Sequence, residues 1–206
     1  MYDVKLHGNI LNEISMKVSK EQAAQNRERI VAAAAQLFRE RGFEGIGVAD
    51  IMKEAGLTHG GFYGHFSSKE DLIAKASARA FADSLVFWSK LGDRASSDPL
   101  SAIADVYLTS THRDNPGAGC LLAALGPEVS RQGTVVRCAV TDYVRSTFEL
   151  LAKLVLGRSK AARRQRVIST YAMLVGAMVM ARAVDDRALS QEILDAALVS
   201  VKTRST

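Results

Sequence analysis

The sequence predicts an all-α protein of about nine helices, and two observations predict this fold class. Apolar residues recur every three or four positions along most of the 206 residues, which is the period of an amphipathic helix. In addition, no stretch alternates apolar and polar residues between turn signals, as a half-buried strand would. The composition, with 48% hydrophobic and 24% charged residues, is that of a folded chain and excludes a disordered one.

The first helix is expected to follow a flexible arm or extension at residues 1–18, where the apolar positions have no clear period. Ser19 and Gln22 have the spacing of a capping box, which marks a helix start. A continuous apolar stripe begins at Ile30. Gly42 follows the last turn, where a glycine can end a helix in the left-handed conformation.

Glycines, prolines and capping residues divide the rest of the chain. A linker is expected at residues 92–99, where Pro99 can occupy the first position of the next helix. Ser68 and Ser159 are expected to cap the helices that follow them. The expected helices after the first span residues 48–55, 58–66, 68–90, 99–113, 121–131, 134–156, 159–184 and 189–202.

Residues 48–66 have the pattern of a helix-turn-helix. The first short helix offers apolar residues for an inward face, namely Ile51, Met52 and Ala55. Gly56 allows a sharp turn and Leu57 can fill its angle. The second helix has Thr58 at the N-cap position and two phenylalanines one turn apart, Phe62 and Phe66. Its other side would then present His59, Tyr63 and His65 to a groove or a phosphate backbone.

The segment from Arg27 to Leu72, and above all residues 57–70 (LTHGGFYGHFSSKE), resembles the DNA-binding domain of the TetR family of bacterial transcriptional regulators. The resemblance covers about 46 of the 206 residues. It implies a helix-turn-helix DNA-binding domain at 19–67 and a larger effector-binding and dimerisation domain at 68–206. It also implies that a small-molecule effector releases the DNA. Residues 119–126 resemble a stretch found in one branch of the family.

The resemblance also implies which residues contact DNA. Thr58 matches the residue that caps the recognition helix and touches phosphate, and His59 falls at a base-contacting position. Tyr63 and His65 match residues that contact the DNA backbone, and Lys69 matches a lysine that reaches phosphate. Gly60 would let the protein backbone approach the DNA closely.

This segment departs from the family pattern in its glycines. Gly61 and Gly64 stand where larger residues are usual, so the recognition helix holds three glycines with Gly60. Each glycine costs about 1 kcal/mol relative to alanine inside a helix. We therefore expect a marginal helix, with base specificity coming from His59, from the backbone at the glycines and from DNA shape.

The two C-terminal helices are rich in small and aliphatic residues: Ala172, Gly176, Ala177, Ala181, Leu194, Ala197, Leu198 and Val201. Such faces suit either a symmetric four-helix interface between two subunits or an ordinary core. The resemblance favours a homodimer, which would present two recognition helices to a double-stranded, palindromic operator.

An effector pocket is expected among the middle helices. Trp88, Tyr107 and Tyr143 are the better candidates for its wall, because each joins an apolar ring to one polar group, and Met173 is a further one. The alternative for each of them is a plain core position. Because these stretches hold few ionisable residues, we expect a small, mostly apolar effector.

Cys120 follows Gly119 at the expected start of a short helix, where the helix dipole can favour a thiolate. One alternative function is therefore a thiol-based electrophile or oxidant sensor that uses Cys120, although a small buried apolar residue is the favoured explanation of this cysteine.

Another alternative function is a helix-turn-helix that binds protein and not DNA. The charge distribution keeps this alternative open, because residues 1–75 carry ten basic and ten acidic residues. The net charge of +5 therefore arises in residues 76–206, which carry seventeen basic and twelve acidic residues.

Other classes of protein lack support in the sequence. No nucleophile, base and oxyanion donor occur at a recognisable spacing, and no glycine-rich phosphate loop follows a strand, so an enzyme is not expected. Cys120 and Cys138 cannot form a four-thiolate zinc site, and no metal or cofactor is expected. No apolar stretch reaches the ~18 to 20 residues of a membrane span, so we expect a cytoplasmic protein without a membrane partner.

Overall fold

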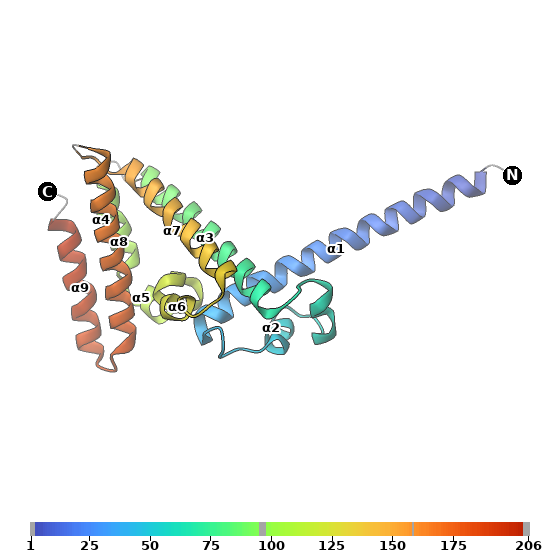
Figure 1. The fold of residues 1–206 in the computed structure, drawn as a ribbon, viewed down its shortest axis with the longest axis horizontal. Coiled ribbons are helices and arrows are strands. Elements are labelled where there is room, and N and C mark those ends of the chain that lie inside the picture. Colours follow the sequence, from blue (N-terminus) through green and yellow to red (C-terminus); the bar gives the residue numbers. More distant parts are fainter. Residues whose placement is uncertain (1–2, 95–97, 158, 204–206) are drawn as a thin grey trace.

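A computed structural model describes residues 3–94, 98–157 and 159–203 of the chain, and the described residues are helical with connecting turns (Figure 1). Nine α-helices occur in these ranges, together with two 3₁₀ helices, which confirms the predicted all-α class. In chain order the elements are α1 (Asp3–Arg41), α2 (Val48–Glu54), η1 (His59–Gly64), α3 (Lys69–Arg94), α4 (Pro99–Tyr107), α5 (Ser110–Asp114), η2 (Pro116–Ala118), α6 (Leu121–Val129), α7 (Thr134–Leu154), α8 (Lys160–Ala183) and α9 (Arg187–Thr203).

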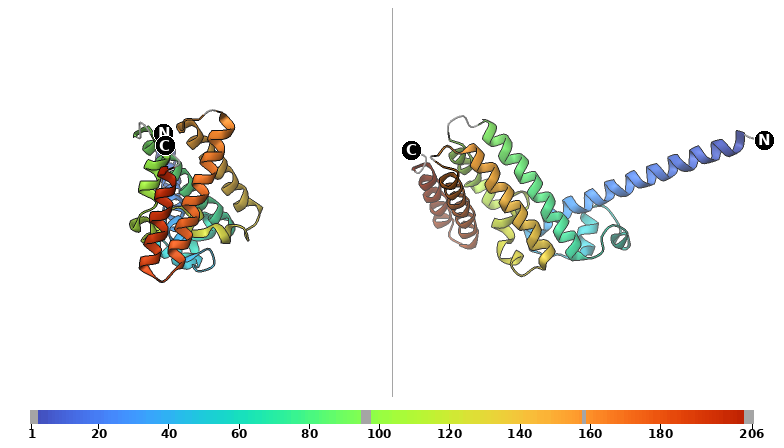
Figure 2. Two further views of the ribbon diagram at one scale, coloured as in Figure 1. Left: turned by 90° about the vertical axis from the view of Figure 1, so that its left-hand side faces the viewer. Right: turned by 45° about the horizontal axis from the view of Figure 1, so that its top comes forward.

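The helices form two groups that share α3, α6 and α7. The C-terminal part of α1 lies against α2 and the start of α3, and its N-terminal part projects away from the body (Figure 1). The long helices α3 and α7 run side by side, and α8 and α9 pair at the end of the molecule that is opposite to α2 (Figure 2). This arrangement places the predicted helix-turn-helix at one end of the molecule and the α8–α9 pair at the other.

Two hydrophobic cores correspond to these groups. The first is built on Phe38, Phe62 and Leu72 and reaches into α6 and α7 through Leu125 and Val136. The second lies between α4, α8, α9 and the later parts of α3 and α7. Because α6 and α7 contribute to both cores, the expected DNA-binding domain has apolar contacts well beyond residue 67.

The first helix begins earlier than the sequence predicted. Residues 3–18, expected as an arm, continue α1, and Ser19 lies inside the helix instead of capping it. Gln22 accordingly donates a hydrogen bond to Asn26 one turn ahead (3.1 Å). The absence of proline and the presence of good helix formers in this stretch allow the helix to extend.

A second difference is a break in the helix expected at residues 99–113. α4 ends at Tyr107 and α5 starts at Ser110, because Thr109 caps the new helix by accepting a hydrogen bond from His112 N (3.2 Å). The capping predictions at Ser68 and Ser159 are confirmed, since their hydroxyls accept from Asp71 N (3.0 Å) and Ala162 N (3.1 Å). Part of the expected linker, residues 95–97, lies outside the described residues.

Among the described helices, α8 alone has the length and apolar composition of a membrane span, with a mean hydropathy of 1.2 over its most apolar window. It packs against α6, α7 and α9. These neighbours bury part of its apolar surface, 39% of the most apolar window.

Candidate functional site: a helix-turn-helix and a cavity behind it

The turn between α2 and η1 depends on Gly56. Its φ of +68° is in the left-handed region, which side chains disfavour. Gly56 N donates to Lys53 O (2.9 Å) and Leu57 N donates to Met52 O (2.9 Å), so the last carbonyls of α2 are paired. A Cβ atom at position 56 would also come within 2.6 Å of the Arg29 guanidinium. The turn predicted from the sequence is therefore present, and it needs this glycine.

The inward face of the helix-turn-helix is apolar and closely packed. Ile51 and Met52 are fully buried, and Phe62 and Phe66 are 1% and 2% exposed. The two phenylalanine rings stack with their centroids 5.6 Å apart, and the Arg27 guanidinium lies over the Phe66 ring. These contacts hold η1 against α1 and α2, so the opposite side of η1 faces outward.

The predicted recognition helix is a 3₁₀ helix in the structure and not an α-helix. Thr58 occupies its N-cap position in an extended conformation, but its side chain accepts no capping hydrogen bond from the described residues, which corrects that expectation. Added Cβ atoms at Gly60 and Gly64 would meet no described atom within 4 Å, so packing does not require glycine there. Low helix propensity at the three glycines accounts for the shorter, tighter helix.

The structure exposes most of the residues predicted to contact DNA. Thr58, His59 and Gly60 are exposed, and the Tyr63 side chain is 74% exposed beside the buried Phe62. His65 is half-buried. Lys69 is also half-buried, in the first turn of α3, and its ammonium lies 3.9 Å from the Glu44 carboxylate.

A cavity of about 720 Å³ lies between α3, α4 and the segment at residues 109–120. Of the predicted effector residues, Trp88 and Tyr107 line it. Tyr143 and Met173 are not among the lining residues. Tyr143 is buried, with its ring stacked on Phe81 at 3.9 Å between centroids, and Met173 packs against the second core.

The cavity wall is more polar than the sequence suggested. It includes charged and hydrogen-bonding residues that were not predicted: Arg39, Asp83, Asp105, His112 and Asn115. The sequence holds no signal for Arg39, because it comes from the last turn of α1 and reaches the cavity only through the packing of α1 on η2.

His112 joins three segments at the edge of the cavity. Its Nδ1 donates to the carbonyl of Tyr107 (2.7 Å) and its Nε2 accepts from Cys120 N (3.0 Å), which requires a neutral ring. Burial lowers the pKa of His112 below its ordinary value, and the nearby Arg182 lowers it further against the opposing effect of the Tyr107 carbonyl. His112 therefore links the end of α4 to the start of α6 in its uncharged form.

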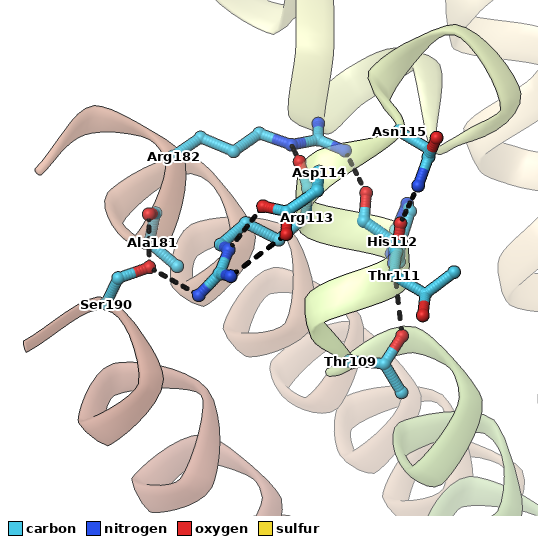
Figure 3. Close-up of polar contacts among 9 residues, drawn as sticks. All are labelled: Thr109, Thr111, His112, Arg113, Asp114, Asn115, Ala181, Arg182 and Ser190. Atoms are coloured by element: carbon cyan, nitrogen blue, oxygen red, sulfur yellow. Dashed lines mark hydrogen bonds and ion pairs between the residues drawn. The ribbon is translucent and has the colours of Figure 1, made fainter. Parts of the chain in front are cut away.

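Arginines tie this segment to the C-terminal helices (Figure 3). Arg182 on α8 donates to the carbonyls of Arg113 (3.0 Å) and His112 (2.6 Å). Arg113 pairs with Asp114 and also donates to Ser190 on α9 (3.1 Å), whose hydroxyl donates to Ala181 O. The wall of the cavity is thus connected to α8 and α9.

Two contacts connect the same region to the helix-turn-helix end. Arg39 Nε donates to Gly117 O (2.8 Å), and burial lowers the pKa of this arginine. At the other end of α6, the Glu128 carboxylate accepts from Phe43 N (2.7 Å). A change in the position of η2 or α6 would therefore act directly on α1 and the loop that follows it.

Cys120 is the N-cap of α6, as predicted, and lines the cavity while being only 7% exposed. Its Sγ lies 3.8 Å from the Tyr171 hydroxyl. This placement agrees with a small buried residue and also sets the thiol beside any occupant of the cavity. Its use as a sensor thiol stays a prediction.

Comparison with known proteins agrees with this geometry. Residues 30–76 match the profile described as bacterial regulatory proteins, tetR family. The chain is 28% identical to the transcriptional repressor NemR of Escherichia coli strain K12 over 195 residues, covering 90% of this chain and 96% of NemR. It is 32% identical to the repressor DhaR of Mycobacterium sp. strain GP1 over 111 residues, which are 54% of this chain and 56% of DhaR.

Solved structures show the same fold. The reduced form of E. coli NemR superposes with a TM-score of 0.72 at 26% identity, covering 86% of this chain and 96% of that one. A TetR-family regulator from Agrobacterium tumefaciens gives a TM-score of 0.70 at 23% identity, with 86% and 98% covered. The exposed helix-turn-helix, the repressor relatives and these structures together show that this chain belongs to the TetR family of bacterial regulatory proteins.

Proposed function

We propose that this chain is a homodimeric, ligand-responsive transcriptional repressor that leaves a palindromic operator when a small effector binds. In this proposal residues 19–67 bind DNA, residues 68–206 bind the effector and dimerise, and the protein is cytoplasmic and not an enzyme. The observation that carries it is the surface of η1, where Tyr63 is 74% exposed beside a nearly fully buried Phe62. A core helix would not present a tyrosine in this way.

The proposed DNA contacts follow from exposure. Thr58, His59 and Tyr63 offer a hydroxyl, an imidazole and a phenol on the outward side of η1, groups that bind phosphates and base edges. The exposed backbone at Gly60 permits close approach. His65 and Lys69 would contact the DNA backbone. To do so, the Lys69 ammonium would leave the Glu44 carboxylate, which is 3.9 Å away, and pair with a phosphate.

The proposed dimer interface is the outward face of α8 with its neighbour α9. Four exposed residues of α8 recur at intervals of four and so share one face: Ile168, Ala172, Gly176 and Met180. Other residues that the sequence grouped with this face, such as Ala177, Ala181 and Leu194, are buried within the chain instead. An exposed apolar face of this kind favours self-association over solvent exposure.

The proposed switch runs along α3 and α6. Trp88 near the end of α3 lines the cavity, and Lys69 at its start belongs to the proposed DNA surface. An effector that displaces Trp88 would tilt α3, and movement of α6 would act on Phe43 through Glu128. Either change would alter the spacing of the two recognition helices in the dimer.

The test is fluorescence anisotropy of the full chain on DNA from its own upstream intergenic region, against scrambled competitor and across a salt series. We expect competitor-resistant binding that weakens steeply with salt and is lost in Tyr63→Ala. Leu156→Ala serves as a control, because Leu156 is 85% exposed and lies far along the chain from η1. Equal affinity for scrambled DNA and for every genomic fragment would overturn the proposal.

A further inference from the structure

Two aromatic side chains with polar hydrogens form part of the cavity wall. Trp88 on α3 and Tyr107 on α4 are 5% and 2% exposed, and their rings stack with centroids 6.0 Å apart. The cavity beside them, of about 720 Å³, has the size of a small-molecule site. The chemistry of these two side chains therefore bears on what the cavity can hold.

Both polar atoms are unpaired. Trp88 Nε1 and the Tyr107 hydroxyl are buried and form no hydrogen bond with any described residue. The Cys120 thiol is an electrostatic neighbour of the Tyr107 hydroxyl, and the Tyr143 hydroxyl is close to Trp88, but neither pair has hydrogen-bond geometry. Buried donors are nearly always paired in native proteins, so this pair of atoms requires an explanation.

The polar groups around these two atoms are mostly hydroxyls, which can both donate and accept. Behind the wall the hydroxyls of Tyr143 and Tyr171 are 3.2 Å apart, and Thr147 Oγ1 is a third buried atom without a partner among the described residues. Burial raises the pKa of Tyr107 and Tyr171 well above 10, so their hydroxyls stay protonated. Because the indole N–H of Trp88 can only donate and the Tyr107 hydroxyl has one hydrogen to donate, an acceptor in the cavity could pair both atoms.

The charges near the cavity already have partners. Asp83 pairs with Arg79 (3.0 Å) and Asp105 with Lys202 (2.6 Å). Arg39 donates to Gly117 O. Arg182, whose charge acts on the Tyr107 hydroxyl, donates to two backbone carbonyls. A charged ligand group placed at Trp88 and Tyr107 would lose its hydration and would have to compete with these existing partners.

We propose that the effector is an uncharged aromatic or conjugated compound whose carbonyl-type oxygen accepts hydrogen bonds from Trp88 Nε1 and the Tyr107 hydroxyl. The inference rests on the proposed function of this chain as an effector-responsive regulator. Because both donors lie within the wall, binding includes a small movement of the two rings. Trp88 is the single tryptophan of the sequence, so its fluorescence reports on this movement directly.

The experiment compares three probes on the full chain: benzophenone, diphenylmethane and 4-benzoylbenzoate. The first two differ only in the carbonyl, and the third adds a negative charge. Calorimetry measures the affinity of each probe, and a change in Trp88 fluorescence shows that the probe binds beside Trp88. In Tyr107→Phe we expect the ratio of benzophenone to diphenylmethane affinity to fall about 10-fold, which corresponds to 1.4 kcal/mol. Leu156→Ala, a change at an exposed site outside the cavity and outside the proposed DNA surface, should leave the ratio unchanged.

The stability of the variant supplies a second measurement. Since the Tyr107 hydroxyl is unpaired, Tyr107→Phe should unfold at the same urea concentration as the parent chain or a higher one. Three outcomes would each overturn the inference. The affinity ratio could be unchanged in Tyr107→Phe, 4-benzoylbenzoate could bind more tightly than the two uncharged probes, or Trp88 fluorescence could stay the same when benzophenone binds. Operator binding without probes is measured in parallel, so loss of selective DNA binding would indicate failure of the proposed function instead.

Discussion

Single residues fix the local geometry at both ends of the proposed switch. Gly56 provides the left-handed turn that orients η1, with φ at +68°. His112 uses both ring nitrogens, one as donor to Tyr107 O and one as acceptor from Cys120 N. Each residue performs a task that few substitutes can perform, so each allows a specific prediction.

Replacing Gly56 with alanine should lower the free energy of unfolding by about 1–2 kcal/mol, because the left-handed conformation is unfavourable for residues with a Cβ. The new Cβ atom would also press on Arg29. Urea denaturation checks this, with Gly60→Ala as the matched control, since its Cβ would meet no described atom within 4 Å. Equal losses in the two variants would contradict the special role of the turn.

The lowered pKa of His112 predicts a pH dependence of stability. On acidification the unfolded chain takes up this proton first, near pH 6.5, while the folded chain resists until the lowered pKa. The contribution to the free energy of unfolding is therefore complete above pH 6.5 and is lost as the pH falls through the folded pKa. Urea denaturation from pH 7.5 to 5 should show a fall that is smaller in His112→Gln. Parallel curves for the two proteins would refute the assignment.

At the scale of the element, η1 is the proposed recognition helix and has little intrinsic helix propensity. Its position depends on Phe62 and Phe66, which pack on α1 and α2, and its glycines contribute no packing of their own apart from Gly61 near Met52. The outward side is therefore free to serve DNA contact and does not have to serve stability.

Alanine at Gly60 or Gly64 should raise the free energy of unfolding by about 0.5–1 kcal/mol, since the backbone loses less entropy and the added Cβ meets open space. Operator affinity should fall for Gly60→Ala, where the Cβ would stand between backbone and DNA. Urea denaturation and anisotropy measure the two effects separately. A destabilised Gly64→Ala protein would show that packing does require the glycine.

At the scale of the whole molecule, the cavity lies between the proposed DNA-binding and dimerisation surfaces and is connected to both. Arg39 and Glu128 link it to α1 and the following loop, and Arg182 links it to α8. A regulator that needs two correctly spaced recognition helices can therefore be controlled from one internal site, provided that α8 and α9 hold two subunits together.

Gly176→Glu should dissociate the proposed dimer, because it places a charge in the middle of the exposed apolar face of α8. Gly126→Glu on α6 is the matched control, since a Cβ at either glycine meets no described atom within 4 Å. Sedimentation velocity should show a monomer for the first variant and a dimer for the second, with operator affinity reduced only in the first. A dimeric Gly176→Glu protein would place the interface elsewhere.

Short-range chemistry made much of this fold predictable. Three kinds of feature depend on neighbours within a few residues: the caps at Ser68 and Ser159, the left-handed glycines at positions 42 and 56, and the inward Phe62 and Phe66. Predictions from neighbouring residues were wrong at two places. They gave one helix at residues 99–113, where the structure has a break before α5, and they gave a helix start at Ser19, which lies inside the continuous α1.

The sequence by itself determined the helical class, the helix-turn-helix and two of the cavity residues, Trp88 and Tyr107. Only the tertiary structure decided that Arg39 reaches the cavity, that His112 pairs with Cys120 N, and that Tyr143 belongs to the core. The physical reason is how far apart along the chain the interacting residues are. Helix formation and turns respond to adjacent residues, whereas a cavity wall is assembled from segments up to about eighty residues apart, whose meeting depends on the packing of all the helices between them.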